Sequence, residues 1–169
     1  MKTLLLMRHA KSSWADPGQD DHDRPLNKRG LRDAPHMGEL LLEKSLVPAS
    51  INCSTAVRAF ETARLVAESC RSSAPLRATA ELYHADIAAW QSVIRQLPAG
   101  SDRALCVGHN PGIEMLVSML TEESHHMATG ALAELELPLD KWAEFDPSKP
   151  LQHWTLWKPK ELPDPAAEG

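Results

Sequence analysis

Short apolar runs alternate along the chain with longer segments in which apolar side chains recur every three or four residues. Residues 4–7 and 104–107 are continuously apolar, which is typical of a strand buried on both faces. Residues 51–53 are a shorter and ambiguous strand candidate, with Asn52 between two apolar side chains. Residues 131–137 and 152–158 are predicted as closing strands, the first because its apolar and polar positions alternate.

Helical spacing of apolar positions covers four segments, namely residues 31–44, 57–70, 87–97 and the stretch after Pro111. Asn27 precedes the first segment and is suited to cap it, because its side chain can accept a hydrogen bond from a free N–H group. Pro35 lies inside the same segment, where a missing N–H group costs about 3 kcal/mol. We therefore expect a kink there or a delayed first turn.

Strands that alternate with helices of this length predict βαβ units. The expected fold class is α/β, a three-layer α/β/α sandwich with a mostly parallel central sheet of about six strands. The length of 169 residues suits one domain, which we assign to residues 1–158. Residues 159–169 are rich in proline and poor in apolar side chains, so we expect a flexible C-terminal tail.

The charge balance argues against a nucleic acid partner, because 18 Lys and Arg against 23 Asp and Glu give a net charge of −5. Three cysteines without a CxxC pair predict neither a disulfide framework nor a zinc ribbon, and they fit a reducing, cytoplasmic setting. The first apolar run ends at Arg8, too early for a signal peptide, and no segment approaches the ~20 apolar residues of a membrane span. The pattern does not indicate an oligomeric state.

Basic residues directly follow the predicted strands. Arg8 and His9 come after the first, Arg58 comes shortly after the second, and His109 follows residues 104–107. Because ligands bind beyond the carboxyl ends of parallel strands, we expect these side chains to meet at one edge of the sheet. Arg58 and His109 also stand where helices begin, and the free N–H groups of a helix start attract anions. The pattern predicts a phosphate site.

Each of these residues taken alone has a simpler explanation. Arg8 could form a surface ion pair, and His9 or His109 could be an ordinary hydrogen-bonded loop histidine. Arg58 is harder to explain in this way, because a cation at a helix start opposes the helix dipole by ~0.3–1 kcal/mol unless an anion lies beside it. Their convergence on one edge favours a functional site.

Three segments in this order resemble the motifs of the histidine phosphatase superfamily. They are LLLMRHA at residues 4–10, STAVRAFETA at residues 54–63 and VGHNP at residues 107–111. RPLNKRG at residues 24–30 and the small size are similar to the phosphohistidine phosphatase branch called SixA. Ala10 departs from the pattern, since many members of the superfamily have glycine there.

The resemblance implies that His9 is a nucleophile that takes the phosphoryl group onto a ring nitrogen and releases it to water. It implies that Arg8, Arg58 and His109 hold the phosphoryl oxygens, and that the reaction needs no metal ion or other cofactor. The expected partner is therefore a phosphorylated substrate.

Arg24 matches the SixA-like segment, and the resemblance makes it a further phosphate or substrate contact. The alternative is a surface arginine paired with Asp21 or Asp23. Lys11 is a weaker candidate contact, and Trp14 could line the cleft or pack beneath the loop.

A general acid is the least defined part of the predicted site. We assign Glu81 as a possible acid, with His84 and Asp86 as neighbouring candidates, although a charged loop residue is an equal explanation for Glu81. The pair His125 and His126 lacks the spacing of a metal site, so no metal ligands are assigned.

The predicted function is metal-independent dephosphorylation through a phosphohistidine at His9, with a phosphohistidine protein as the substrate. A small phosphoester phosphatase and a mutase are the enzymatic alternatives. A phosphate-binding module without catalysis is an alternative of another class, which retention of His9 beside the arginines disfavours.

Overall fold

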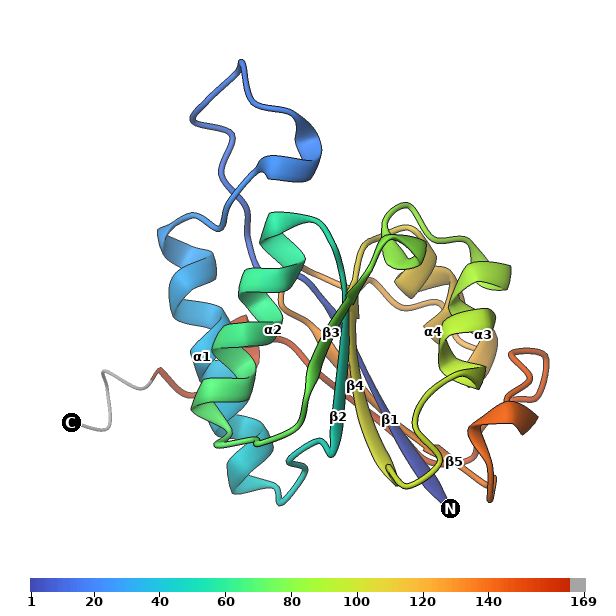
Figure 1. Cartoon of the computed structure of the whole chain (residues 1–169). Coiled ribbons are helices and arrows are strands. Elements are labelled where there is room, and N and C mark those ends of the chain that lie inside the picture. The colour runs from blue at the N-terminus through green and yellow to red at the C-terminus, as the bar shows by residue number, and fades with distance from the viewer. Residues whose placement is uncertain (165–169) are drawn as a thin grey trace.

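A computed structural model of the protein describes residues 1–164, built on a central sheet flanked by helices (Figure 1). The strands are β1 (Lys2–Arg8), β2 (Ser50–Ser54), β3 (Leu76–Thr79), β4 (Arg103–Gly108), β5 (Leu132–Leu137) and β6 (Trp154–Trp157). The helices are α1 (Lys28–Glu43), α2 (Val57–Ser69), α3 (Ile87–Arg95) and α4 (Gly112–Thr121). Four 3-10 turns complete the described elements, η1 (Asp21–Asp23), η2 (Ala80–Leu82), η3 (Trp142–Glu144) and η4 (Pro159–Glu161).

The sheet has six strands in the order β3-β2-β4-β1-β5-β6. Neighbours from β3 to β1 are parallel, whereas β5 runs antiparallel to both β1 and β6. The predicted α/β class and mostly parallel sheet are confirmed. Strand β3 was not among the predicted strands, because this four-residue edge strand carries Arg77 and Thr79 and lacks a continuous apolar run.

Successive side chains of β1 point to opposite faces of the sheet and belong to two separate apolar cores. Leu5 and Met7 of β1 pack with buried residues of α1 and α2. Leu4 and Leu6 of the same strand pack on the other face with buried residues of α3 and α4. A strand with both faces covered is apolar at every position, which explains the run of residues 4–7. Helices therefore cover both faces, as expected for a three-layer sandwich.

Helix α1 begins where its cap predicts. The Asn27 side chain accepts a hydrogen bond of 2.9 Å from the N–H group of Gly30, and the Asn27 N–H group donates to the carbonyl of Lys11 at 3.0 Å. The helix runs from Lys28 to Glu43 with Pro35 inside it, so the expected delay of the first turn is wrong. The cap fixes the start of the helix before the proline is reached.

The first part of the predicted C-terminal tail has a defined conformation. Pro159 is buried at the start of η4, and Leu162 packs against the core that α1 and α2 cover. Residues 165–169 of that predicted tail lie outside the described residues. Within residues 1–164, no helix is both long and apolar enough to cross a membrane.

Close packing of α1 on the loop after β1 makes Gly30 sensitive to substitution. A Cβ atom at this position would collide with the backbone carbonyl of Lys11, whereas a Cβ at Gly100 would meet no atom within 4 Å. We expect Gly30→Ala to lower the free energy of unfolding by about 1–3 kcal/mol in urea denaturation, because the backbone must shift to relieve the overlap. Gly100→Ala is the matched control, and equal stability of the two variants would contradict the prediction.

Candidate active site

A cavity of about 340 Å³ opens beyond the carboxyl ends of β1 and β4. Its walls include the side chains predicted to hold a phosphoryl group, Arg8, His9, Arg24, Arg58 and His109, together with the weaker candidates Lys11 and Trp14. These residues come from segments far apart in the sequence, and the parallel strands bring them to one edge of the sheet.

Glu81 is the exception among the predicted site residues. It is exposed on η2 and lines a separate hollow with Asn52 and Arg77, not the cavity that holds His9. Its role as a possible acid stays a prediction. His84, two residues beyond η2, does line the cavity, in a left-handed backbone conformation with φ of 56°.

His9 is buried, with one ring nitrogen engaged by the backbone. Its Nδ1 lies 2.7 Å from the carbonyl oxygen of Ala10, and because a carbonyl can only accept, Nδ1 carries the proton. The N–H group of Ala10 donates in turn to the Thr62 hydroxyl at 3.0 Å, which fixes this turn of the chain. Burial foremost, together with the charges of Arg58 and Arg8, lowers the pKa of His9 to about 3. The ring is therefore neutral at pH 7, with a lone pair on Nε2.

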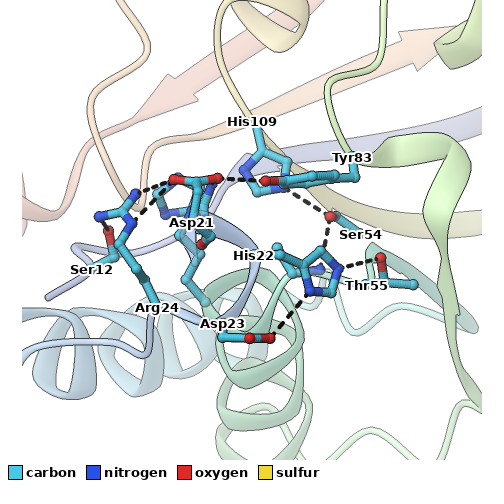
Figure 2. Close-up of polar contacts among 12 residues, drawn as sticks. Ser12, Asp21, His22, Asp23, Arg24, Ser54, Thr55, Tyr83 and His109 are labelled. Atoms are coloured by element: carbon cyan, nitrogen blue, oxygen red, sulfur yellow. Dashed lines mark hydrogen bonds and ion pairs between the residues drawn. The ribbon is translucent and has the colours of Figure 1, made fainter. Parts of the chain in front are cut away.

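His109 lies beside His9, with 5.1 Å between the ring centroids. Its Nε2 is 2.8 Å from the hydroxyl oxygen of Ser54, a contact that Figure 2 shows. Burial lowers the pKa of His109 to about 3, so this ring is also neutral. The Ser54 oxygen also accepts from the N–H group of Ala56 at 3.1 Å. In the tautomer in which the Ser54 hydroxyl donates to Nε2 of His109, Nδ1 of that ring carries the proton.

Three buried N–H positions of the cavity side chains have no hydrogen-bond partner within the described residues. They are Nε of Arg8, Nε of Arg58 and Nδ1 of His109. Buried polar groups are nearly always paired in folded proteins, and each unpaired one costs about 1–3 kcal/mol. An oxyanion in the cavity would supply the acceptors that these groups lack.

Arg24 forms the ion pair of the surface alternative and also lies at the cavity. It pairs with Asp21 at 3.1 Å, as the surface alternative proposed, yet it is buried and lines the cavity. The Ser12 hydroxyl accepts from Nη1 of Arg24 at 2.9 Å, and the ring of Trp14 lies 3.5 Å from the guanidinium carbon. Its position beside the site is thus fixed by contacts on several sides (Figure 2).

Asp21 is a part of the site that sequence reasoning placed only as a partner of Arg24. Its carboxylate also lies 3.0 Å from Nη2 of Arg58 and accepts a hydrogen bond of 2.6 Å from the Tyr83 hydroxyl. These contacts, that of Tyr83 foremost, hold the pKa of Asp21 well below its usual range. The sequence feature that comes closest to indicating this role is the i,i+3 spacing of Asp21 and Arg24 across one short turn.

Buried neutral histidines make the stability of the fold sensitive to acid. The pKa of His9 rises from about 3 in the folded state to an ordinary value near 6.5 in the unfolded chain, which therefore binds more protons between these limits. Stability is complete above pH 6.5 and falls as the pH drops towards 3. From pH 7 to pH 5 we expect a loss of about 2 kcal/mol from each such histidine.

Urea denaturation at pH 7 and pH 5 measures this loss, and the variant His9→Gln should lose about 2 kcal/mol less than the native chain. His153→Gln is the control, because the side chain of His153 is exposed. Identical pH dependence in the native chain and His9→Gln would show that His9 is not held neutral by burial.

Comparisons with known proteins identify the family of the chain. Residues 4–99 match the family model described as histidine phosphatase superfamily, branch 1. An uncharacterized chloroplastic protein of Arabidopsis thaliana is 32% identical over 154 residues, which cover 85% of this chain and 70% of the relative.

Two solved structures share the fold, both assigned as phosphohistidine phosphatase SixA. The Agrobacterium tumefaciens protein has a TM-score of 0.74 and 28% identity, covering 80% of this chain and 91% of its own. The Nakamurella multipartitia protein has a TM-score of 0.73 and 30% identity, covering 91% of this chain and 95% of its own. The chain therefore belongs to branch 1 of the histidine phosphatase superfamily, with SixA phosphohistidine phosphatases among its structural neighbours.

Proposed function

We propose that the protein is a phosphohistidine phosphatase that works through a covalent intermediate on Nε2 of His9. The observation that carries the proposal is a buried, neutral His9 with one free ring nitrogen, set among three cavity N–H groups that have no acceptor. A neutral imidazole is a competent nucleophile, and unpaired donors are ready to hold a phosphoryl group.

In the first step, the Nε2 lone pair of His9 forms a bond to phosphorus while the bond from phosphorus to the leaving group breaks. The attacking ring becomes positively charged, and its Nδ1 proton stays hydrogen-bonded to the carbonyl of Ala10. In the second step water attacks the phosphorus, the bond from phosphorus to Nε2 breaks, and neutral His9 returns with release of inorganic phosphate.

The phosphoryl oxygens are held by groups with fixed geometry. Arg8 and Arg58 present planar guanidinium groups that match phosphoryl oxygens, and these cations stabilise the charge of the transition state. His109 contributes its Nδ1 proton in the tautomer in which Nε2 accepts from the Ser54 hydroxyl. None of these roles requires a metal ion. Each role requires the loops after β1, β2 and β4 to hold their side chains in these positions.

The substrate that we assign to the site is a phosphohistidine side chain on another protein. Trp14 is 72% exposed at the mouth of the cavity, and His84 is also exposed, so planar and polar surface is available to a presented side chain. The bond between phosphorus and an imidazole nitrogen is weaker than a phosphoester bond, so cleavage depends less on a general acid. The similarity to SixA structures supports the same substrate class.

Phosphate release in excess EDTA tests the catalytic proposal. We expect His9→Ala to lose at least 10³-fold in kcat, because the nucleophile is gone, while its affinity for tungstate stays within a few-fold of that of the native chain. Native enzyme quenched in mid-reaction should carry a phosphoryl group that is labile in acid and stable in alkali, as a phosphorus–nitrogen bond is. His153→Ala, at an exposed position, is the matched control.

Turnover that survives in His9→Ala would overturn the covalent mechanism. Tungstate binding without any turnover of a phosphohistidine peptide or p-nitrophenyl phosphate would instead favour a phosphate-binding module. Among active outcomes, a higher kcat/KM for the phosphohistidine peptide supports the proposed substrate, and a higher kcat/KM for p-nitrophenyl phosphate would favour a small phosphoester phosphatase.

A further inference from the structure

The carboxylate of Asp21 already occupies the side chains that face an incoming anion. One oxygen lies 3.1 Å from Nη2 and 3.2 Å from Nε of Arg24. The other lies 3.0 Å from Nη2 of Arg58 and 2.6 Å from the Tyr83 hydroxyl, as Figure 2 shows in part. The backbone carbonyl of Asp21 accepts a further bond of 2.6 Å from Nη1 of Arg58. A carboxylate that bridges two arginines in this way stands in for a bound oxyanion.

We propose that Asp21 is an internal competitor that the phosphoryl group of the substrate displaces from Arg24 and Arg58, and that this exchange selects dianionic phosphoryl groups over monoanions. The inference rests on the proposed function, because it concerns the same cavity. It assigns to Asp21 a role in substrate specificity.

Asp21 occupies hydrogen-bond donors of both arginines. Both terminal nitrogens of Arg58 donate to Asp21, and only its Nε lacks a partner. Bidentate binding of a phosphoryl group uses two nitrogens on one edge of a guanidinium. At Arg24 the Asp21 carboxylate already occupies such an edge, since one of its oxygens lies 3.2 Å from Nε and 3.1 Å from Nη2. Substrate and carboxylate therefore compete for that edge of Arg24.

The negative charge of Asp21 also opposes a phosphoryl group bound in the cavity. The Asp21 carboxylate lines the same cavity as Arg8, His9 and Arg24, so a phosphoryl group bound there meets a like charge at short range. Repulsion between close, partly desolvated anions is strong, so the bound state favours withdrawal of Asp21. In the free protein the same carboxylate neutralises guanidinium groups that burial would otherwise leave without a counterion.

The turn that carries Asp21 can move without opening a core. None of the residues of η1 is buried, and in Figure 1 the segment between β1 and α1 projects beyond the end of the sheet. Besides Asp21, its side-chain contacts include the 2.9 Å hydrogen bond between His22 and the Thr55 hydroxyl. Displacement of the turn thus breaks polar contacts and the edge contact between the rings of His22 and Tyr83, whose centroids are 4.9 Å apart, and it exposes no buried residue of the turn itself.

Selectivity follows from what each ligand gains in the exchange. A phosphoryl dianion brings two charges and three terminal oxygens, enough to replace Asp21 and also to reach the unpaired N–H groups of Arg8 and His109. A monoanion such as a phosphodiester replaces one negative charge with another and gains little. The site therefore admits phosphomonoesters and phosphoramidates and rejects diesters.

Anion affinity of the native chain and of Asp21→Asn tests this inference. We expect the variant to bind inorganic phosphate about tenfold more tightly by calorimetry at pH 8, because an amide keeps the shape of the side chain and removes the competing charge. Dimethyl phosphate, a monoanion, should bind to Asp21→Asn and bind at least tenfold more weakly to the native chain. Asp23→Asn is the matched control, since Asp23 lies on the same turn with its carboxylate 3.6 Å from His22.

Tyr83→Phe provides a second variant that keeps every charge. It removes the 2.6 Å hydrogen bond to the Asp21 carboxylate, so phosphate affinity should rise by a few-fold. Unchanged or weaker phosphate binding in Asp21→Asn and Tyr83→Phe, with turnover of the native chain intact, would overturn the competitor role and leave the proposed function standing. Absence of phosphate binding in the native chain and in all variants, together with absence of turnover, would overturn both.

Discussion

The hydrogen bond from Nδ1 of His9 to the carbonyl of Ala10 decides which chemistry the cavity can support. It fixes the ring tautomer, so the nitrogen that remains is an unprotonated nucleophile in surroundings rich in positive charge. The positive charges of Arg58 and Arg8 favour the neutral form of the His9 ring. The neutral ring in turn adds no repulsion to the arginines around it. The backbone turn at Ala10, tied to Thr62 of α2, is thus the point at which the fold and the reaction meet.

Charge neutrality is the second constraint on the site. A cavity that must bind a dianion needs several cations near one another, and in the absence of ligand those cations repel. The protein resolves this conflict with a carboxylate on a surface turn, since the turn can retreat while α1 and α2 stay packed on the sheet. Asp21 therefore supplies the countercharge of Arg24 and Arg58 in the free protein, in addition to the contacts with Ser12 and Trp14 that hold Arg24.

The sequence predicts most of the framework, because the framework depends on local patterns. Continuous apolar runs identify β1 and β4, and Asn27 identifies the start of α1, since burial on both faces and helix capping each leave a mark within a few residues. Strand β3 leaves no such mark. It pairs with β2 on one side only, and Arg77 is exposed within it.

Some residues of the site can be predicted from local patterns, whereas others depend on contacts between positions far apart in the sequence. Residues that follow strands directly, such as His9 and His109, are predictable because parallel strands end at one edge. The contacts of Asp21 with Arg58 and Tyr83 join positions 37 and 62 residues apart, so no local pattern encodes them. Glu81 stays a predicted acid, and it lies on a three-residue turn that borders a different hollow.

The exposed turn η1 separates the selection of a substrate from the stability of the fold. Residues in a core are constrained jointly, since a change in one disturbs the packing of its neighbours. Positions on this turn lie outside that packing, so variation there disturbs no buried apolar side chain. Ligand preference can therefore change through a few surface positions while the sheet and the histidines stay the same, and the folding cost falls on the ion pairs of Asp21 with Arg24 and Arg58.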